Sequence, residues 1–306
     1  MDEIYISVII TAYNRRKFLL EAVQSVLNQT LGREKYEIIV IKNFRDDTID
    51  KLTEENHIKN IMMDDIIGNY LYKGITEARG NIISFLDDDD IFFQNKLEVV
   101  YNIFKSNSNL VFYHNLPQFI DELKTPLNKS GNALSFNLSC ISIKKNIVNL
   151  QNIKNIYILQ DSFMLYSAFE SNGLIISGKQ LLSYYRLHNS ASNFNGSNVT
   201  KIQFKNKLNQ TFISQLEVFE NYFKSRKAKK YIINYMVTLK LNNNIFYKLG
   251  YSQKYYNLNV KEIIKYLLIF NYWGKRKGYI LKYLKLLEVH VPEKLLRRKL
   301  ERSLLP

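Results

Sequence analysis

Short runs of consecutive apolar residues alternate with amphipathic segments through the first part of the chain. The runs Ile4–Ile10, Glu37–Ile41 and Asn81–Leu86 are typical of strands that are buried on both faces. Arg15–Asn28 and Tyr70–Ala78 instead carry apolar residues at the spacing of a helix. This alternation predicts an α/β fold with a doubly wound, mainly parallel sheet that helices cover on both faces.

The pattern changes twice further along the chain. Asn132–Lys144 and Leu181–Leu187 predict strands, and Asp161–Glu170 predicts a helix between them. After residue 197 helical spacing is found over Phe212–Lys224, Lys230–Leu241 and Lys261–Phe270. We therefore expect a first domain of residues 1–197 and a helical C-terminal extension of residues 198–306.

The composition indicates an ordered protein without disulfides. Hydrophobic residues make up 46% of the chain, which is enough to form a sizeable core. The single cysteine, Cys140, excludes an intrachain disulfide, and its apolar neighbours predict a core residue rather than a catalytic thiol. The acidic start Met1–Tyr5 is unlike a signal peptide, and no apolar stretch has the length of a spanning helix. We therefore expect a cytoplasmic protein that is soluble or peripheral on the cytoplasmic face of a membrane.

Charge is distributed unevenly along the chain. Residues 201–306 hold 23 basic and 6 acidic side chains, a net charge of +17, whereas residues 1–200 have a net charge of −2. In the extension, Tyr266–Lys277 and Lys294–Leu305 combine basic with apolar residues, as expected for contact with an anionic membrane surface. A packed helical subdomain with a solvated basic face is the alternative. A nucleic-acid partner is not expected, although it would use the same charge.

The sharpest local feature is the acidic run Asp87–Asp90, which directly follows a predicted buried strand. Ligands bind at the carboxyl ends of the strands in a doubly wound sheet. Four adjacent carboxylates repel one another, and a divalent cation such as Mn²⁺ or Mg²⁺ would relieve that repulsion and bind phosphate oxygens. A solvated acidic turn is the alternative.

Four segments, in this order, resemble glycosyltransferase family 2 of the GT-A fold. Ser7–Arg15 is similar to the family's opening strand and donor-binding turn, and Ser25–Thr30 to the end of its first helix. Glu37–Ile41 is similar to the second strand, and Ala78–Asp90 to the segment that ends in the DXD motif. The resemblance covers about residues 4–192. It implies a Rossmann-like GT-A domain that moves a sugar from a nucleoside diphosphate sugar to a glycan or lipid-linked acceptor.

The resemblance also implies roles for single residues. Those expected to contact the nucleotide sugar are Thr11, Tyr13, Arg15, Asp87 and Asp88. The Tyr13 ring would lie near the base, although Tyr13 is also one of 22 tyrosines and could simply end a strand. Asp89 would be the principal ligand of the metal, which would act as a Lewis acid on the departing diphosphate.

One position departs from the family pattern and concerns the base. Asn43 stands where a carboxylate usually contacts the base. Its amide oxygen can accept a hydrogen bond from a base N–H, but its amide nitrogen can also donate. The identity of the base therefore stays open, with a UDP-sugar as the default.

Two more residues complete the implied site. Gln160 and Asp161 resemble the family's acidic pair, whose second carboxylate deprotonates the acceptor hydroxyl in an inverting displacement. An N-cap of the following helix is the alternative for Asp161. His188 would be a further metal ligand or a diphosphate contact, unless it is an ordinary histidine after a strand. Arg186 would either orient a phosphate or support the loop.

Two other classes of function remain open. A metal-dependent nucleotidyltransferase would use the same carboxylates but release pyrophosphate. A basic membrane-binding or nucleic-acid-binding module would need no catalytic carboxylates at all.

Overall fold

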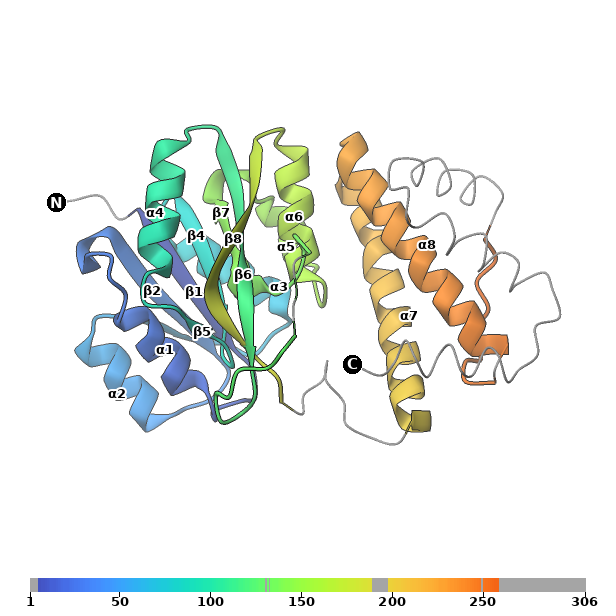
Figure 1. Ribbon diagram of the computed structural model, residues 1–306, viewed down its shortest axis with the longest axis horizontal. Coiled ribbons are helices and arrows are strands. Elements are labelled where there is room, and N and C mark those ends of the chain that lie inside the picture. Colours follow the sequence, from blue (N-terminus) through green and yellow to red (C-terminus); the bar gives the residue numbers. More distant parts are fainter. Residues whose placement is uncertain (1–4, 130, 132, 189–197, 249, 259–306) are drawn as a thin grey trace. The chain divides into compact units, whose positions relative to one another are not determined.

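The computed structural model describes residues 5–129, 131, 133–188, 198–248 and 250–258 (Figure 1). The chain divides into two compact units, Met1–His188 and Asn189–Pro306. We predict a catalytic part of residues 1–197 and an extension of residues 198–306. The function of each part stays a prediction.

The first unit is built on one eight-stranded sheet with the order β3-β2-β1-β4-β7-β6-β8-β5. The strands are β1 (Ile6–Ala12), β2 (Tyr36–Lys42), β3 (Lys59–Met62), β4 (Ile82–Asp87), β5 (Ile91–Phe92), β6 (Leu110–Ile120), β7 (Ile141–Lys144) and β8 (Leu174–Arg186). β3, β2, β1 and β4 pair in parallel. The other half is mixed, because β7 is antiparallel to both of its neighbours and β5 is antiparallel to β8, whereas β6 and β8 are parallel.

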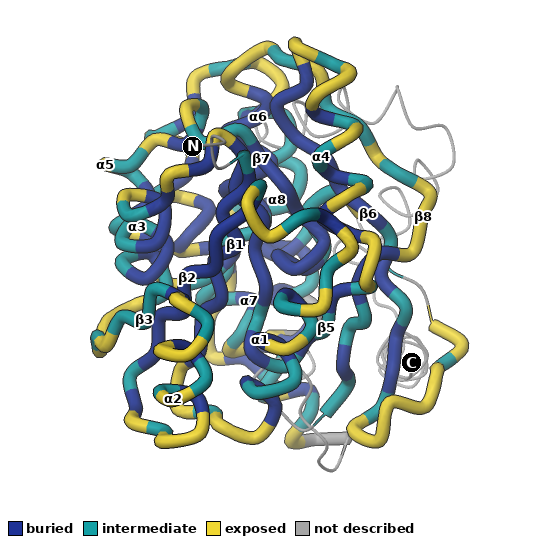
Figure 2. The backbone as a smooth tube through the Cα atoms, turned by 90° about the vertical axis from the view of Figure 1, so that its left-hand side faces the viewer, coloured by how far each residue is buried: buried dark blue, intermediate teal, exposed yellow. Residues whose placement is uncertain are grey.

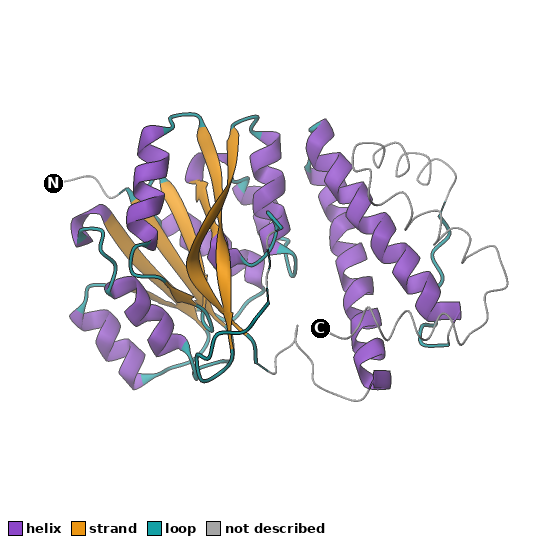
Figure 3. Cartoon of the chain, viewed as in Figure 1, coloured by secondary structure: helices purple, strands orange, loops and turns teal. Residues whose placement is uncertain are grey.

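Helices connect these strands and cover the sheet. They are α1 (Leu19–Leu27), α2 (Asp47–Glu55), α3 (Ile67–Glu77), α4 (Lys96–Ser106), α5 (Leu150–Ile153) and α6 (Gln160–Glu170), with 3₁₀ turns η1 (Arg33–Lys35), η2 (Leu138–Cys140) and η3 (Lys145–Ile147). The first unit thus alternates strands and helices, as Figure 3 shows. The predicted α/β class is confirmed.

Alternate residues of β1 face two different helical layers. Val8 and Ile10 belong to the same core cluster as Val23 of α1. Ile9 faces the other way: a Cβ added at Gly74 of α3 would lie 2.8 Å from Ile9 Cγ2. Because both faces are covered, every residue of β1 and β2 is buried, and both strands are dark blue in Figure 2.

The register of β1 and β4 sets the place of the acidic run. Thr11 of β1 is paired with Asp87, the last residue of β4. Because the two strands are parallel, the turn after each lies at the same edge of the sheet. The segments that follow, Tyr13–Arg15 and Asp88–Asp90, are therefore neighbours despite their separation in sequence.

The region between β6 and β7 differs from our prediction. Of the described residues in the predicted strand segment Asn132–Lys144, only Ile141–Lys144 form a strand. Leu138–Cys140 forms η2, and Cys140 is fully buried in the core, as predicted. Burial raises the pKa of its thiol to about 12, which excludes a reactive thiolate.

The described part of the second unit contains two long helices, α7 (Asn198–Tyr222) and α8 (Arg226–Lys248), which pack against each other. α8 extends beyond the predicted segment Lys230–Leu241 at both ends, whereas α7 begins before the predicted segment Phe212–Lys224 and ends two residues short of it, at Tyr222. Among the described residues, no helix has the combination of length and apolarity that crossing a membrane requires. The predicted segments Lys261–Phe270, Tyr266–Lys277 and Lys294–Leu305 lie outside the described residues.

Candidate active site

The acidic run forms a tight turn at the end of β4. The backbone N–H of Asp90 donates to the carbonyl oxygen of Asp87 over 3.1 Å. Asp88 and Asp90 are buried, whereas Asp87 and Asp89 keep some exposed surface. Carboxylate oxygens of Asp87, Asp89 and Asp90 lie within 4.8 Å of one another. An all-oxygen donor set of this size fits Mn²⁺ or Mg²⁺.

The electrostatics of the turn favour a cation. Burial, together with the charges of Asp90 and Asp89, raises the pKa of Asp87 well above its ordinary value. Burial and Asp89 raise the pKa of Asp90 to about 7, and burial raises that of Asp88 to about 6 although Arg15 opposes the shift. Without a cation these carboxyl groups hold protons more tightly than in water, so a metal must compete with those protons.

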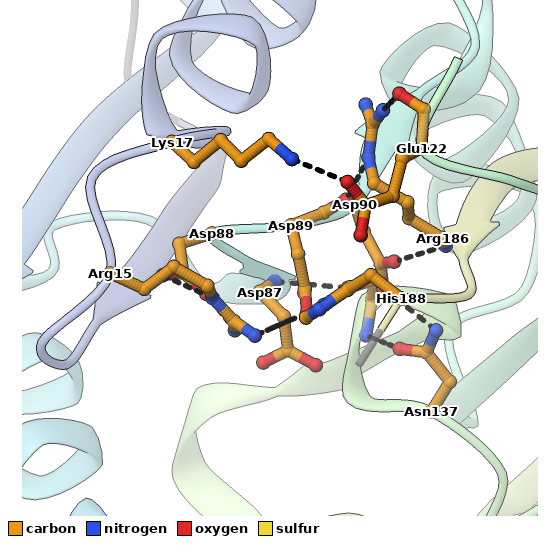
Figure 4. A network of polar contacts seen from close by, with 11 residues as sticks. Arg15, Lys17, Asp87, Asp88, Asp89, Asp90, Glu122, Asn137, Arg186 and His188 are labelled. Carbon is orange, nitrogen blue, oxygen red and sulfur yellow. Dashed lines mark hydrogen bonds and ion pairs between the residues drawn. The ribbon is translucent and has the colours of Figure 1, made fainter. Parts of the chain in front are cut away.

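Hydrogen bonds from distant segments fix the turn (Figure 4). Asn137 donates to Oδ2 of Asp90 over 2.7 Å, and the backbone N–H of Arg186 donates to Oδ1 over 3.0 Å. The backbone N–H of Asp87 donates to Oγ of Ser139 in η2 over 2.9 Å. Sequence reasoning gave Asp90 no role of its own, yet two distant segments anchor it and, among the described residues, it is one of three possible ligands.

Arg15 and His188 meet at Asp89. Arg15 Nη1 lies 2.8 Å from Oδ2 of Asp89, and its Nε donates to Asp88 over 3.0 Å. His188 Nε2 lies 2.7 Å from the same Asp89 oxygen and 3.1 Å from Arg15 Nη1. Burial lowers the pKa of Arg15, but Asp88 and Asp89 more than offset this, so the guanidinium stays charged. The structure therefore brings two predicted residues, Arg15 and His188, together at the carboxylate of a third, Asp89.

A cleft of about 430 Å³ opens beside this cluster. Its lining comprises the predicted donor residues Thr11, Tyr13, Arg15, Asp87 and Asp88, together with Asp65, Ile66, Ile67, Tyr70 and Tyr157. Tyr13 is 56% exposed, and its ring packs against that of Tyr70 in a T-shaped arrangement with 6.3 Å between centroids. Sequence reasoning missed the second group, although all of its members except Tyr157 follow β3 and must therefore reach the same edge of a parallel sheet.

Asn43 is not among the residues that line this cleft. Its Oδ1 accepts from the backbone N–H of Asn14 over 2.9 Å, and its Nδ2 donates to Oδ1 of Asn14 over 2.9 Å and of Asp64 over 3.2 Å. Asn14 has a positive φ of 54°, a conformation that these hydrogen bonds help to hold. The amide thus fixes the turn that carries Tyr13, and its contact with a base stays a prediction.

Asp161 lies in the first turn of α6, close to the carboxylate cluster. The residue that caps this helix is Leu159, with a positive φ of 63°, so the N-cap alternative for Asp161 is wrong. Burial raises the pKa of Asp161 to about 6, although backbone N–H groups of Asp161 and Asn137 oppose the shift. The charge of Asp161 also contributes to the raised pKa of Asp87. A carboxylate with a pKa near neutrality is suited to general-base catalysis.

Arg186 supports the loop rather than facing the donor cleft. Its side chain is 1% exposed, and its three nitrogens donate to the carbonyl oxygens of Asp89 and Glu122, both over 2.9 Å, and to Oε2 of Glu21 over 2.6 Å. The guanidinium also lies 4.3 Å from the centre of the Phe18 ring. Because each nitrogen already donates to protein, the phosphate-orienting role is not supported.

Comparison with known proteins agrees with this geometry. The model of glycosyl transferase family 2 matches residues 7–167, slightly more than half of the chain. The chain therefore belongs to glycosyltransferase family 2.

Relatives and solved structures extend this finding. An uncharacterized glycosyltransferase of Rickettsia bellii is 38% identical over 128 residues, which are 38% of this chain and only 17% of that protein. The Escherichia coli UDP-Glc:alpha-D-GlcNAc-diphosphoundecaprenol beta-1,3-glucosyltransferase WfaP is 28% identical over 200 residues, 60% of this chain and 77% of that protein.

Two solved structures share the fold. Residues 1–349 of S. aureus TarS, in complex with UDP-GlcNAc, match with a TM-score of 0.57 and 13% identity, over 87% of this chain and 79% of that chain. The mannosyltransferase PcManGT of Pyrobaculum calidifontis, in complex with GDP-Man and Mn²⁺, matches with a TM-score of 0.56 and 11% identity, over 92% of this chain and 84% of that chain. The predicted GT-A fold with a helical C-terminal region is confirmed.

Proposed function

We propose that this chain transfers a sugar from a nucleoside diphosphate sugar to a hydroxyl group, with inversion at the anomeric carbon and with the help of a divalent cation. The observation that carries the proposal is the grouping of Asp87, Asp89 and Asp90 beside a cleft that Asp87 lines, with the Asp161 carboxylate close enough to act on Asp87. TarS with UDP-GlcNAc and PcManGT with GDP-Man and Mn²⁺ support both the donor class and the cation.

The donor would lie in the cleft with its base near the Tyr13 and Tyr70 rings. Aromatic faces stack on a base whatever its identity, so the lining supports a nucleotide without selecting uracil. At the other end, Arg15 offers a positive charge to the diphosphate. Asp89, with Asp87 and Asp90, would hold the cation, which when bound stabilises negative charge on the leaving diphosphate.

Asp161 would act as the general base. It would accept the proton of the acceptor hydroxyl as that oxygen forms its bond to the anomeric carbon and the bond to the diphosphate breaks. Direct attack from the face opposite the leaving group inverts the configuration of that carbon. His188 would orient Asp89 through its 2.7 Å contact or contribute as a further ligand.

The acceptor is proposed from a relative only. WfaP acts on a sugar linked through diphosphate to undecaprenol, so a lipid-linked glycan is a reasonable acceptor class for this chain. An acceptor of this kind would suit a protein held on the cytoplasmic face of a membrane by its basic C-terminal third.

The proposal can be tested in two stages. A thermal-shift screen of UDP-, GDP- and dTDP-sugars, each with Mn²⁺ and with chelator, should show cation-dependent stabilisation by at least one donor, because ligand binding raises stability by mass action. Turnover of that donor should then release nucleoside diphosphate, whereas pyrophosphate would indicate a nucleotidyltransferase. Asp89→Asn should abolish both effects, and Asp47→Asn, at an exposed acid of α2, should change neither. Stabilisation that survives chelation and Asp89→Asn would refute the metal site.

A further inference from the structure

A second cleft, of about 640 Å³, shares no lining residue with the donor cleft. It is formed by α1, by β5 with the turn that follows it, and by the end of β8. β5 begins with Ile91, directly after Asp90, so one edge of this cleft is continuous in sequence with the acidic turn, whose residues Asp87 and Asp88 line the donor cleft. The reaction proposed above gives this second cleft no role.

Uncharged amide side chains dominate the polar lining. Gln24 lies in α1 and Asn28 caps its C-terminal end, where a spacing of four places them on one face, and Gln94 and Asn95 come from the turn after β5. All four are exposed, and among the described residues none of their amide groups has a hydrogen-bond partner. Each amide can both donate and accept, which matches the hydroxyl groups of a sugar.

An aromatic pair forms another part of the lining. The rings of Phe93 and Tyr184 lie 4.3 Å apart between centroids with a tilt of 36°, and both keep some exposed surface. The electron-rich face of such a ring favours contact with weakly positive hydrogens, like those on the C–H face of a pyranose. Amides beside an aromatic surface are therefore suited to a sugar ring, which is polar at its edge and less polar on its faces.

The charges in the cleft cancel. Its acidic residue, Glu21, pairs with Lys124 over 3.2 Å and also accepts from Arg186 over 2.6 Å. A cleft without a free charge gives no advantage to phosphates, nucleotides or acidic peptides. Glu21 also connects the cleft to the acidic turn, because the same Arg186 donates to the carbonyl oxygen of Asp89.

We propose that this amide-rich cleft is a second saccharide-binding site that takes uncharged sugar residues of the acceptor glycan. The inference rests on the proposed function in one respect only, that the acceptor is a glycan. Binding at this cleft would hold a longer acceptor while one of its hydroxyl groups reacts, so it would affect the recognition of long acceptors more than the chemical step.

Binding can be measured without turnover. The full chain is titrated with uncharged trisaccharides of glucose, mannose, galactose and N-acetylglucosamine, and with trigalacturonic acid, using saturation-transfer NMR to detect contact and shift titration to obtain Kd. At least one uncharged trisaccharide should bind more tightly than trigalacturonic acid. The double variant Gln24→Ala/Gln94→Ala should weaken that binding about tenfold, since two hydrogen bonds of ordinary strength are lost. Tyr184→Leu should weaken it by a similar factor through loss of the ring.

The matched control is the double variant Asn102→Ala/Gln151→Ala, which removes two exposed amides outside the cleft and should leave Kd unchanged. Cation-dependent stabilisation by the nucleotide sugar serves as the check that each variant is folded. The inference is overturned if no uncharged trisaccharide binds, or if binding is unchanged in both cleft variants. Failure of donor binding and turnover in the unaltered protein would instead count against the proposed function, so the two results are distinguishable.

Discussion

Replacing Asp161 by asparagine tests the proposed chemistry most directly. The change keeps the size of the side chain at the start of α6 but removes its ability to accept a proton. General-base catalysis contributes about 10²- to 10⁴-fold to a rate, so we expect turnover to fall by a factor in that range. The raised pKa adds a second signature. With a pKa of about 6, the carboxyl group is mostly ionised at pH 7 and about one-tenth ionised at pH 5.

The turnover of the unaltered protein should therefore fall about tenfold between pH 7 and pH 5, because a protonated Asp161 cannot act as a base. The variant should be slow and nearly independent of pH over that range. The assay is release of nucleoside diphosphate from the donor selected by thermal shift, at saturating Mn²⁺ at each pH. Glu170→Gln, at the other end of α6, should behave like the unaltered protein. Full turnover of Asp161→Asn, or an unchanged pH profile, would show that another group takes the proton.

Three further outcomes are expected. Cation binding should weaken as pH falls from 7.5 to 5.5, because the raised pKa values of the proposed ligands Asp87 and Asp90 let protons compete with the cation. Calorimetric titration with Mn²⁺ that gave the same affinity at both pH values would contradict this. Without a cation, thermal stability should decrease as pH rises from about 4 to 7, because a carboxyl group whose folded pKa is raised stabilises the fold while protonated and costs free energy once ionised. Added Mn²⁺ should reverse this trend in scanning calorimetry. A melting temperature that did not change with pH would refute the assigned pKa shifts. Gly74→Ala should lower the free energy of unfolding by about 1–3 kcal/mol, because the new Cβ would lie 2.8 Å from Ile9. Gly32→Ala should lower it less, since there the obstructing group is the movable side chain of Glu34. Equal denaturation midpoints for the two variants would contradict this account of the packing.

The strands in the parallel half of the sheet could be predicted from sequence, because the apolar pattern that indicates each strand is local. Ile82–Asp87 is an apolar strand that ends in carboxylates, and both the strand and its place at the ligand-binding edge follow from that pattern. The strands in the mixed half of the sheet were harder to predict. β6 is an eleven-residue strand that includes His114, Asn115 and Pro117, residues that weaken a strand pattern. Its pairing with β7 and β8 depends on contacts distant in sequence.

The site shows the same contrast. The predicted donor residues line one cleft because they follow strands that are neighbours in the sheet. The anchoring of Asp90 by Asn137 could not be predicted, because it depends on how a long irregular segment folds back under the turn. Asn43 shows a different limit: its position in the sequence indicated a base contact, but only the structure reveals that Asn14 and Asp64 already engage its amide.

The contact between Arg15 and His188 joins positions 173 residues apart. A chain emerging during synthesis would form β1, β4 and the acidic turn well before Arg186 and His188, at the end of β8 and just after it, reach them. Until then the turn lacks the backbone N–H of Arg186 and the His188 ring, and contacts between positions so distant in sequence form slowly, because the entropy of closing the loop is lost before the contacts are made. Catalytic competence should consequently be acquired late in folding, after most of the first unit has already become compact.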